Sequence, residues 1–238
     1  MIHSRHTTEG ETGNMCAYRA KDAYREAGEA DTYDAVRFKS LRGRLTDWLE
    51  KRAIRRALCA VPSGARVLDL PCGTGRITEL LLDLGYRVVG ADISEPMMAH
   101  AREKLAGYSN LEDLRQADAE SLPFADEEFD AVISIRFSNH VPPDVRLRVL
   151  GEMRRVCRGP IIISYCNPNA ASACKRRLRA LLRRPHAPWY PATPREVDAE
   201  ARSADLRVVR GHAMLPLVSE TVVYLMCRPG AAAGEPTG

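Results

Sequence analysis

Two acids that each end a short apolar segment are the residues of this chain best placed to bind a nucleotide-like ligand. Asp69 ends the first segment, and a glycine turn at 73–75 follows it directly. Glycine has no Cβ, so such a turn lets the backbone approach a ligand closely. Asp92 ends the next apolar segment, 87–92. An acid about 20 residues beyond a glycine turn can accept both hydroxyls of a ribose. This spacing predicts a nucleoside site.

Two common phosphate-binding patterns are missing from the sequence. Counted from Gly73, the dinucleotide fingerprint G-x-G-x-x-G needs a third glycine at the position that Thr78 occupies. The phosphate loop G-x-x-x-x-G-K-[ST] does not occur anywhere in the chain. The site therefore fits neither an ordinary dinucleotide nor a nucleoside triphosphate.

Alternating apolar patterns predict the elements that would position these acids. Period-two or continuous apolar runs predict strands, and apolar residues three or four apart predict helices. We expect strands at 66–70, 87–91, 111–116, 130–135, 160–165, 206–212 and 220–227, and helices at 34–60, 75–84, 95–106, 144–156, 170–184 and 194–204. Ser94 and Asp144 are expected to begin two of the helices. The alternation predicts an α/β fold with a doubly wound, mostly parallel sheet, whose ligands bind beyond the carboxyl ends of the strands.

At these positions the chain resembles the class I S-adenosylmethionine (SAM)-dependent methyltransferases. Residues 69–75 resemble the first motif of that family, 88–92 the second, and 116–119 the third, which lies beside the adenine. Further motifs at 129–135 and 154–164 resemble the fourth strand and the approach to the fifth, and the resemblance covers roughly residues 33–228. It implies a Rossmann-like seven-stranded sheet with an antiparallel C-terminal hairpin and a helical N-terminal lid.

The resemblance also implies a cofactor, SAM, with S-adenosylhomocysteine as product. Pro71 stands where the family usually has the first glycine of its turn, and we expect binding to survive because Gly73 and Gly75 keep the closest approach. The residues that would bind the cofactor are Asp69, Pro71, Cys72, Gly73, Gly75, Asp92, Ile93, Asp118, Ala119 and Ile135.

The segment 32–48 resembles the N-terminal helices of ubiquinone- and menaquinone-biosynthesis C-methyltransferases, which lie over cofactor and substrate. The alternative is that Phe38, Leu41 and Trp48 only pack this helix against the sheet. Together with the segments after the fourth and fifth strands, it supplies our candidates for substrate binding: Tyr33, Arg37, Arg44, Arg136, Phe137, Tyr165 and Tyr190.

His140 is the candidate general base. Histidine changes its charge near neutral pH, so it could accept a proton from a hydroxyl, thiol or amine. The alternative is a loop histidine that is bonded to backbone. Arg136 could hold an anionic substrate or the carboxylate of SAM, or it could serve a structural ion pair.

The reaction predicted is methyl transfer to a small or lipid-like acceptor, most simply at oxygen or carbon. The sequence lacks an N/D-P-P-Y/F motif and a Pro-Cys nucleophile after the fourth strand, which disfavours base methylation. Two alternatives stay open: an RNA methyltransferase that uses the basic helix 170–184, and a SAM-binding partner protein without activity. The basic helix could also contact an anionic membrane, or be a solvated face. It holds Lys175, Arg176, Arg177, Arg179, Arg183 and Arg184.

Composition agrees with a single enzyme domain. The net charge of +4 is too small to require a nucleic-acid partner, and we expect no DNA. The seven cysteines form no metal-binding spacing, so we expect no metal. Their distribution is typical of a reduced, cytoplasmic protein. We expect a monomer or homodimer. We expect a mobile segment 1–30, one domain at 31–228 with a lid at 31–62 and an insert at 166–193, and a disordered tail at 229–238.

Overall fold

The fold follows the alternating apolar pattern. A computed structural model describes residues 40–168, 189–215 and 219–230. Seven strands form one sheet: β1 (Arg66–Asp69), β2 (Arg87–Asp92), β3 (Leu111–Gln116), β4 (Ala131–Ser134), β5 (Ile161–Cys166), β6 (Arg207–Ala213) and β7 (Thr221–Cys227). Between them lie α3 (Leu41–Leu58), α4 (Arg76–Asp83), α5 (Glu95–Leu105), the short 3-10 helix η2 (Ser138–His140), α6 (Pro143–Val156) and α8 (Pro194–Ser203).

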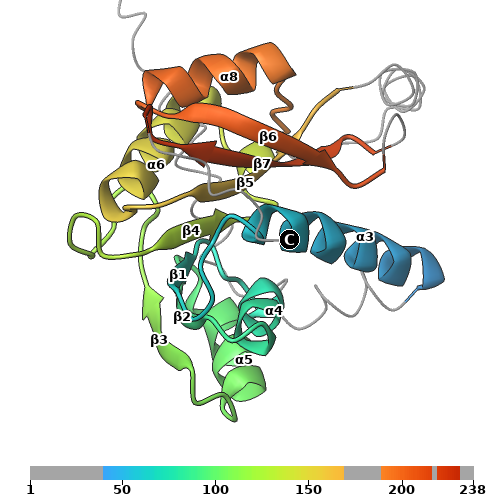
Figure 1. The fold of residues 1–238 in the computed structure, drawn as a ribbon. Coiled ribbons are helices and arrows are strands. Elements are labelled where there is room, and N and C mark those ends of the chain that lie inside the picture. Colours follow the sequence, from blue (N-terminus) through green and yellow to red (C-terminus); the bar gives the residue numbers. More distant parts are fainter. Residues whose placement is uncertain (1–39, 169–188, 216–218, 231–238) are drawn as a thin grey trace, which may run out of the picture.

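The strands are arranged in the order β3-β2-β1-β4-β5-β7-β6 (Figure 1). Strands β1 to β5 pair in parallel, and β7 is antiparallel to both of its neighbours, β5 and β6. The predicted doubly wound sheet with a C-terminal hairpin is therefore confirmed. The chain reverses its direction of winding between β1 and β4, and open α/β sheets bind ligands at this switch point.

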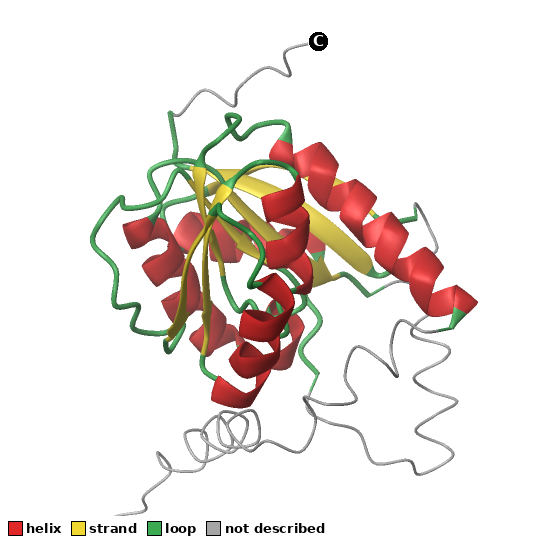
Figure 2. Ribbon diagram, turned by 90° about the horizontal axis from the view of Figure 1, so that it is seen from below, coloured by secondary structure: helices red, strands yellow, loops and turns green. Residues whose placement is uncertain are grey.

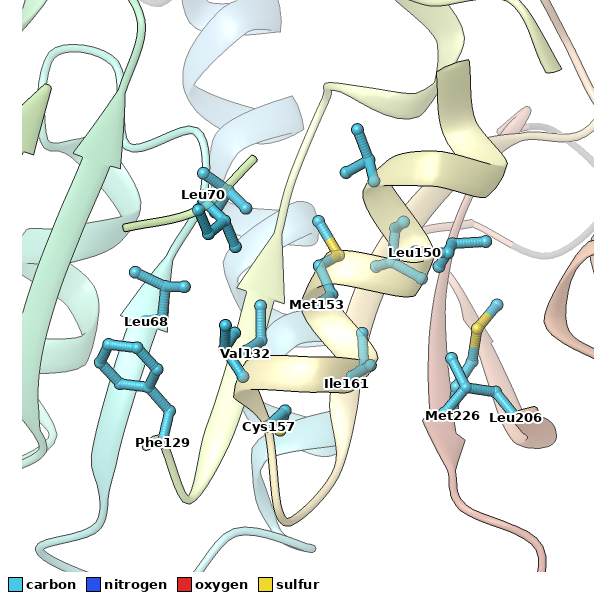
Figure 3. Close-up of a cluster of buried hydrophobic side chains, with 14 of the residues drawn as sticks. Leu68, Leu70, Phe129, Val132, Leu150, Met153, Cys157, Ile161, Leu206 and Met226 are labelled. Carbon is cyan, nitrogen blue, oxygen red and sulfur yellow. The ribbon is translucent and has the colours of Figure 1, made fainter. Parts of the chain in front are cut away.

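Helices cover both faces of the sheet (Figure 2). On one face, α6 and α8 pack against the strands, and Figure 3 shows Leu150 and Met153 of α6 beside Val132 and Ile161 of the strands. On the other face, α3, α4 and α5 build a second cluster. Each fully buried aliphatic side chain contributes roughly 1.5–3 kcal/mol by leaving water, and β1 faces both clusters with alternate residues.

The predicted helices and strands that fall within the described residues are all present, with ends shifted by a few residues at most, except that α3 is described only from Leu41. The helix predicted at 170–184, the segment 1–30 and the tail from residue 231 lie outside the described residues. Asp144 does not begin α6: Pro142 is the N-cap, and Asp144 pairs with Arg148 instead. Across the described part of the chain, every helix is too short or too polar to span a bilayer.

Helix α3 corrects one packing expectation. Its inner face, which includes Ala53, Ile54 and Ala57, is buried against the sheet. Leu41 is 84% exposed and Trp48 is 55% exposed, so the alternative in which these two residues pack the helix on the sheet is wrong. The remaining residue of that alternative, Phe38, lies outside the described residues.

Candidate functional site

A cleft opens at the carboxyl ends of β1, β2 and β4, at the switch point of the sheet. Four segments line it, one after each of the strands β1 to β4. They contribute residues 70–74 with 76 and 77, residues 92–94 with 97, residues 117–120, and residues 135–137, 140–142, 145 and 149. Since parallel strands end at the same edge, motifs far apart in the sequence meet here.

Asp92 lies on the wall of this cleft and is held by backbone. Its Oδ2 accepts a hydrogen bond from the Gly73 N–H at 2.8 Å, and its Oδ1 accepts one from the Ser94 N–H at 2.9 Å. Burial raises the pKa of this carboxyl, although the backbone donors oppose the shift. A carboxylate has about four acceptor positions, so these backbone donors leave acceptor capacity for a ligand hydroxyl.

Asp69 takes a different position. It is 1% exposed, it does not line the cleft, and its Oδ2 accepts a 2.7 Å hydrogen bond from the Thr78 hydroxyl. Burial raises the pKa of Asp69 to about 7. The carboxylate joins β1 to the helix α4 behind the glycine turn, and its predicted contact with a cofactor stays a prediction.

The two glycines of the turn also differ. Both have positive φ, 54° at Gly73 and 79° at Gly75. A Cβ on Gly73 would meet only the Met97 sulfur at 3.8 Å, and Gly73 lines the cleft. A Cβ on Gly75 would lie 2.8 Å from Leu105 Cδ1, and Gly75 does not line the cleft. Backbone conformation and packing against α5 therefore require a glycine at position 75, and its predicted approach to the ligand stays a prediction.

The other predicted cofactor residues all line the cleft. They are Pro71, Cys72, Ile93, Asp118, Ala119 and Ile135. Asp118 Oδ1 accepts the Glu120 N–H at 3.0 Å, which fixes the turn after β3. Burial raises the pKa of the Cys72 thiol, so this cysteine stays protonated and uncharged in the cleft wall.

A buried ion-pair network joins α3 to the cleft. The Glu50 carboxylate is completely buried and accepts hydrogen bonds from Arg76 at 2.6 Å and from Arg136 Nε at 2.7 Å. Arg76 also pairs with Asp47. Arg136 has a left-handed backbone, with φ of 62°, and both arginines line the cleft. Of the two interpretations of Arg136, the structural ion pair is therefore observed, at a position that also lines the cleft.

His140 lines the cleft at the end of η2, where its N–H donates to the Phe137 carbonyl at 2.9 Å. Phe137 lies on the same wall. Both lie in the segment between β4 and α6, just after Arg136 with its left-handed backbone. Their predicted roles in the reaction stay predictions.

Three of the remaining substrate candidates are described by the structure, and none of these three lines the cleft. Tyr165 is a core residue, 1% exposed, whose hydroxyl donates to Glu200, and burial raises its pKa. Tyr190 is fixed through its backbone, which bonds to Asn139 and Arg146. Arg44 is exposed on α3. Tyr33 and Arg37 lie outside the described residues.

Sequence reasoning missed several cleft residues. Thr74, Arg76, Ser94, Met97 and Glu120 all line it. It also missed Glu50, although a signal was available: this acid falls in helical register with Ala53, Ile54 and Ala57, on the apolar face of α3. A charge at such a position needs partners, and two arginines supply them.

The polar and apolar groups that line the cleft suit a nucleoside. Two acids, Asp92 and Asp118, lie beside apolar walls that include Ile93, Ala119 and Ile135. Such a mixture of few polar groups and a mostly apolar surface is typical of small-molecule sites. Among the described residues, no group of three or more His, Cys, Asp or Glu side chains could hold a metal ion.

Comparison with known proteins finds similarity to methyltransferases. Residues 67–159 match a family model described as a methyltransferase domain. The chain is 45% identical over 127 residues to a demethylmenaquinone methyltransferase of Clavibacter sepedonicus, covering 51% of this chain and 49% of that protein. It is 41% identical over 104 residues to a phosphatidylethanolamine N-methyltransferase of Cereibacter sphaeroides, covering 42% and 50%. The chain thus spans about half the length of these relatives.

A solved structure agrees with the fold. The magnesium protoporphyrin IX methyltransferase of Synechocystis PCC 6803, solved with bound SAH, superposes with a TM-score of 0.73. The match covers 89% of this chain and 99% of that chain at 16% sequence identity. At this identity the likeness shows the fold, which is the one that the alternating sequence pattern predicts.

Proposed function

We propose that this chain, whose residues 67–159 match a methyltransferase domain, is a class I SAM-dependent enzyme that transfers the methyl group of SAM to a small or lipid-like acceptor. The observation that carries the proposal is Asp92. It faces the cleft at the switch point of the sheet, and it keeps acceptor capacity after bonding Gly73 and Ser94. The relatives that methylate quinone precursors and phospholipid head groups support an acceptor of this class.

The chain's residues would bind and orient both reactants. Asp92 would accept the two ribose hydroxyls, and Asp118 with Ala119 would border the adenine. Gly73 would lie closest to the methionine part, since it is the glycine that lines the cleft. When bound, SAM supplies a methyl group that its sulfonium already activates, so alignment is the main task left to the protein.

The acceptor would enter on the side formed after β4. Phe137, Val141, Val145 and Val149 give this wall an apolar surface, which suits a quinone-like or lipid-like molecule. His140 lies on the same wall and would take the proton from an acceptor hydroxyl or an acidic carbon. Oxygen and carbon are therefore the acceptor atoms that we propose.

Binding and transfer are tested separately. Calorimetry with SAM and S-adenosylhomocysteine measures cofactor binding, and labelled SAM measures transfer to a panel of phenols, hydroxyquinones and phospholipids. We expect binding of both nucleosides and transfer to one acceptor class. A folded protein that binds neither nucleoside would overturn the proposal.

His140 is tested by its rate effect. His140→Ala should lower the rate at saturating SAM by about 10²–10⁴-fold, and His140→Gln nearly as much, because glutamine cannot take a proton. SAM affinity should stay unchanged. His212→Gln, on β6 away from the cleft, is the matched control. A near-normal rate in both His140 variants would leave alignment alone as the source of catalysis.

The RNA alternative is tested in the full chain. Its basic segment lies outside the described residues, so the experiment depends on charge alone. If RNA were the acceptor, replacing Arg176, Arg177, Arg183 and Arg184 with Gln would weaken RNA binding and flatten its salt dependence. We expect no salt-sensitive RNA binding in a gel-shift titration at two salt concentrations.

A further inference from the structure

The outer face of α3 combines large apolar side chains with arginines. Among the residues of this helix whose side chains the structure describes, the exposed ones are Leu41, Arg44, Leu45, Trp48, Arg52, Arg55 and Arg56. Leu41 is 84% exposed, and Leu45 and Trp48 are each 55% exposed. These three are spaced i, i+4 and i+7, so they form one line along the helix. With 3.6 residues per turn, all seven exposed residues fall within an arc of about 120°.

Charges on this helix are separated by sign. Its two acids, Asp47 and Glu50, turn toward the body of the protein, where they pair with Arg76, and Glu50 also pairs with Arg136. The exposed residues of α3 include four arginines and no acid. An ordinary solvated helix mixes both signs on its outer face. This face therefore has a positive potential around an apolar line.

The physical properties of the face fit a membrane surface. A helix that lies in the interface of a bilayer buries an apolar stripe at the boundary of head groups and acyl chains, and its flanking cations meet anionic lipid phosphates. Tryptophan is enriched at this depth because its ring is apolar and its N–H is polar. Arginine can bury its aliphatic stem and keep its charged end in water. In the structure Arg52 already stacks over the Trp48 ring, 5.6 Å from its centroid.

We propose that α3 docks this protein on an anionic lipid surface, with Leu41, Leu45 and Trp48 inserted between the head groups and the arginines on lipid phosphates. RNA would engage the arginines but would leave two leucines in water, so the apolar line favours lipid. Figure 1 shows α3 along one side of the sheet, and its buried Glu50 pairs with Arg76 and Arg136 of the cleft wall. The cleft is thus separated from the docking face by one helix diameter, about 10 Å.

The surface does not depend on methyl transfer, so its test needs no SAM. The chain has two tryptophans, Trp48 and Trp189. In the full-length Trp189→Phe variant, Trp48 is the only indole and reports directly on α3. Vesicles of phosphatidylcholine with phosphatidylglycerol should shift its emission to the blue, and brominated acyl chains should quench it. Pure phosphatidylcholine vesicles should do neither, and added salt should weaken the effect.

Flotation with the same vesicles measures binding of variants. Leu41→Ser with Leu45→Ser should lower partition into anionic vesicles by at least about tenfold, because apolar area that the bilayer buries is lost. Arg52→Gln, Arg55→Gln and Arg56→Gln together should flatten the salt dependence. Leu147→Ser on α6, also partly exposed, is the matched control and should bind like the parent.

Three results would overturn the proposal. The first is Trp48 emission that no vesicle changes. The second is flotation that persists in the leucine variant but disappears when Arg176, Arg177, Arg183 and Arg184 are replaced by Gln, since binding would then belong to that segment. The third is a dimer of the parent protein, seen by light scattering without lipid, that is absent in the leucine variant. The face would then join two copies of the chain. Failure of methyl transfer would affect none of these measurements.

Discussion

Asp69 and Asp92 end neighbouring parallel strands and have the same sequence signal, an acid after an apolar run, but the structure gives them different tasks. The register explains the difference. Asp69 pairs with Gly90, so Asp92 lies two residues farther along the sheet, roughly 6–7 Å nearer the cleft. Asp92 faces the cleft, whereas Asp69 stays below the glycine turn and bonds Thr78. The ends of adjacent strands are therefore not equivalent ligand positions.

The glycines repeat this contrast. Gly73 lies at the cleft surface and Gly75 against α5, although only two residues separate them. One member of each pair lines the cleft, where we expect it to meet the ligand, and the other supports the turn behind it. Four measurements test this division between a contacting and a supporting layer.

The largest effect is expected at Gly75. Gly75→Val should destabilise the fold by at least about 3 kcal/mol, because valine disfavours positive φ and its Cβ would overlap Leu105 and crowd Ala101. Urea unfolding measures the loss. Gly85→Val is the matched control: its φ is 83°, and a Cβ there meets nothing within 4 Å. If both variants lose equal stability, packing against α5 is not the reason for Gly75.

The second prediction is that Asp69 makes the free energy of unfolding depend on pH. Its pKa is raised from 3.8 to about 7 by burial, so the folded protein holds a proton that the unfolded chain releases. The stabilisation from this group is complete below about pH 4 and is lost as pH rises to about 7, at no more than about 1.4 kcal/mol per pH unit.

Asp69→Asn should remove that dependence, because asparagine resembles the neutral acid and can still accept from Thr78. Unfolding by urea at several pH values between 4 and 8 gives the difference between parent and variant. A difference that stays constant across this range would show that Asp69 is ionised in the folded protein throughout.

Asp92→Ala should weaken SAM binding by roughly 10- to 150-fold, which is the loss of a charge-assisted hydrogen bond worth ~1.5–3 kcal/mol. Calorimetry measures the affinity, and circular dichroism checks that the fold survives the loss of the acceptor for Gly73 and Ser94. Glu95→Gln replaces an exposed acid three residues away and serves as the control. Unchanged affinity in a folded Asp92→Ala protein would remove Asp92 from the site.

The smallest effect is expected on the SAM affinity of the Asp69→Asn variant. Asp69→Asn should change SAM affinity by no more than about twofold, since the carboxylate does not line the cleft. The same calorimetric titration, at one pH, gives the result. A loss as large as that of Asp92→Ala would place both acids in contact with the ligand and end the distinction between them.

Much of this protein follows from the sequence alone. Apolar periodicity is a local property, so it predicted every strand and every α-helix in the described residues to within a few positions, but not the short 3-10 helix η2. The alternation of strands and helices predicted the parallel sheet, and the family resemblance implied the C-terminal hairpin. The glycine turn and the acid of β2 gave the position of the cleft, because parallel strands must end at a common edge.

Tertiary structure decided which residues of each motif face the cleft. Strand register separates Asp92 from Asp69, and packing of α5 assigns Gly75 to the interior. Contacts between distant segments bring Glu50 to Arg76 and Arg136, place Tyr165 in the core, and leave Leu41 and Trp48 on the surface. A residue's spacing shows which face of its own element it occupies, but only the packing of the elements determines whether that face meets core, cleft or solvent.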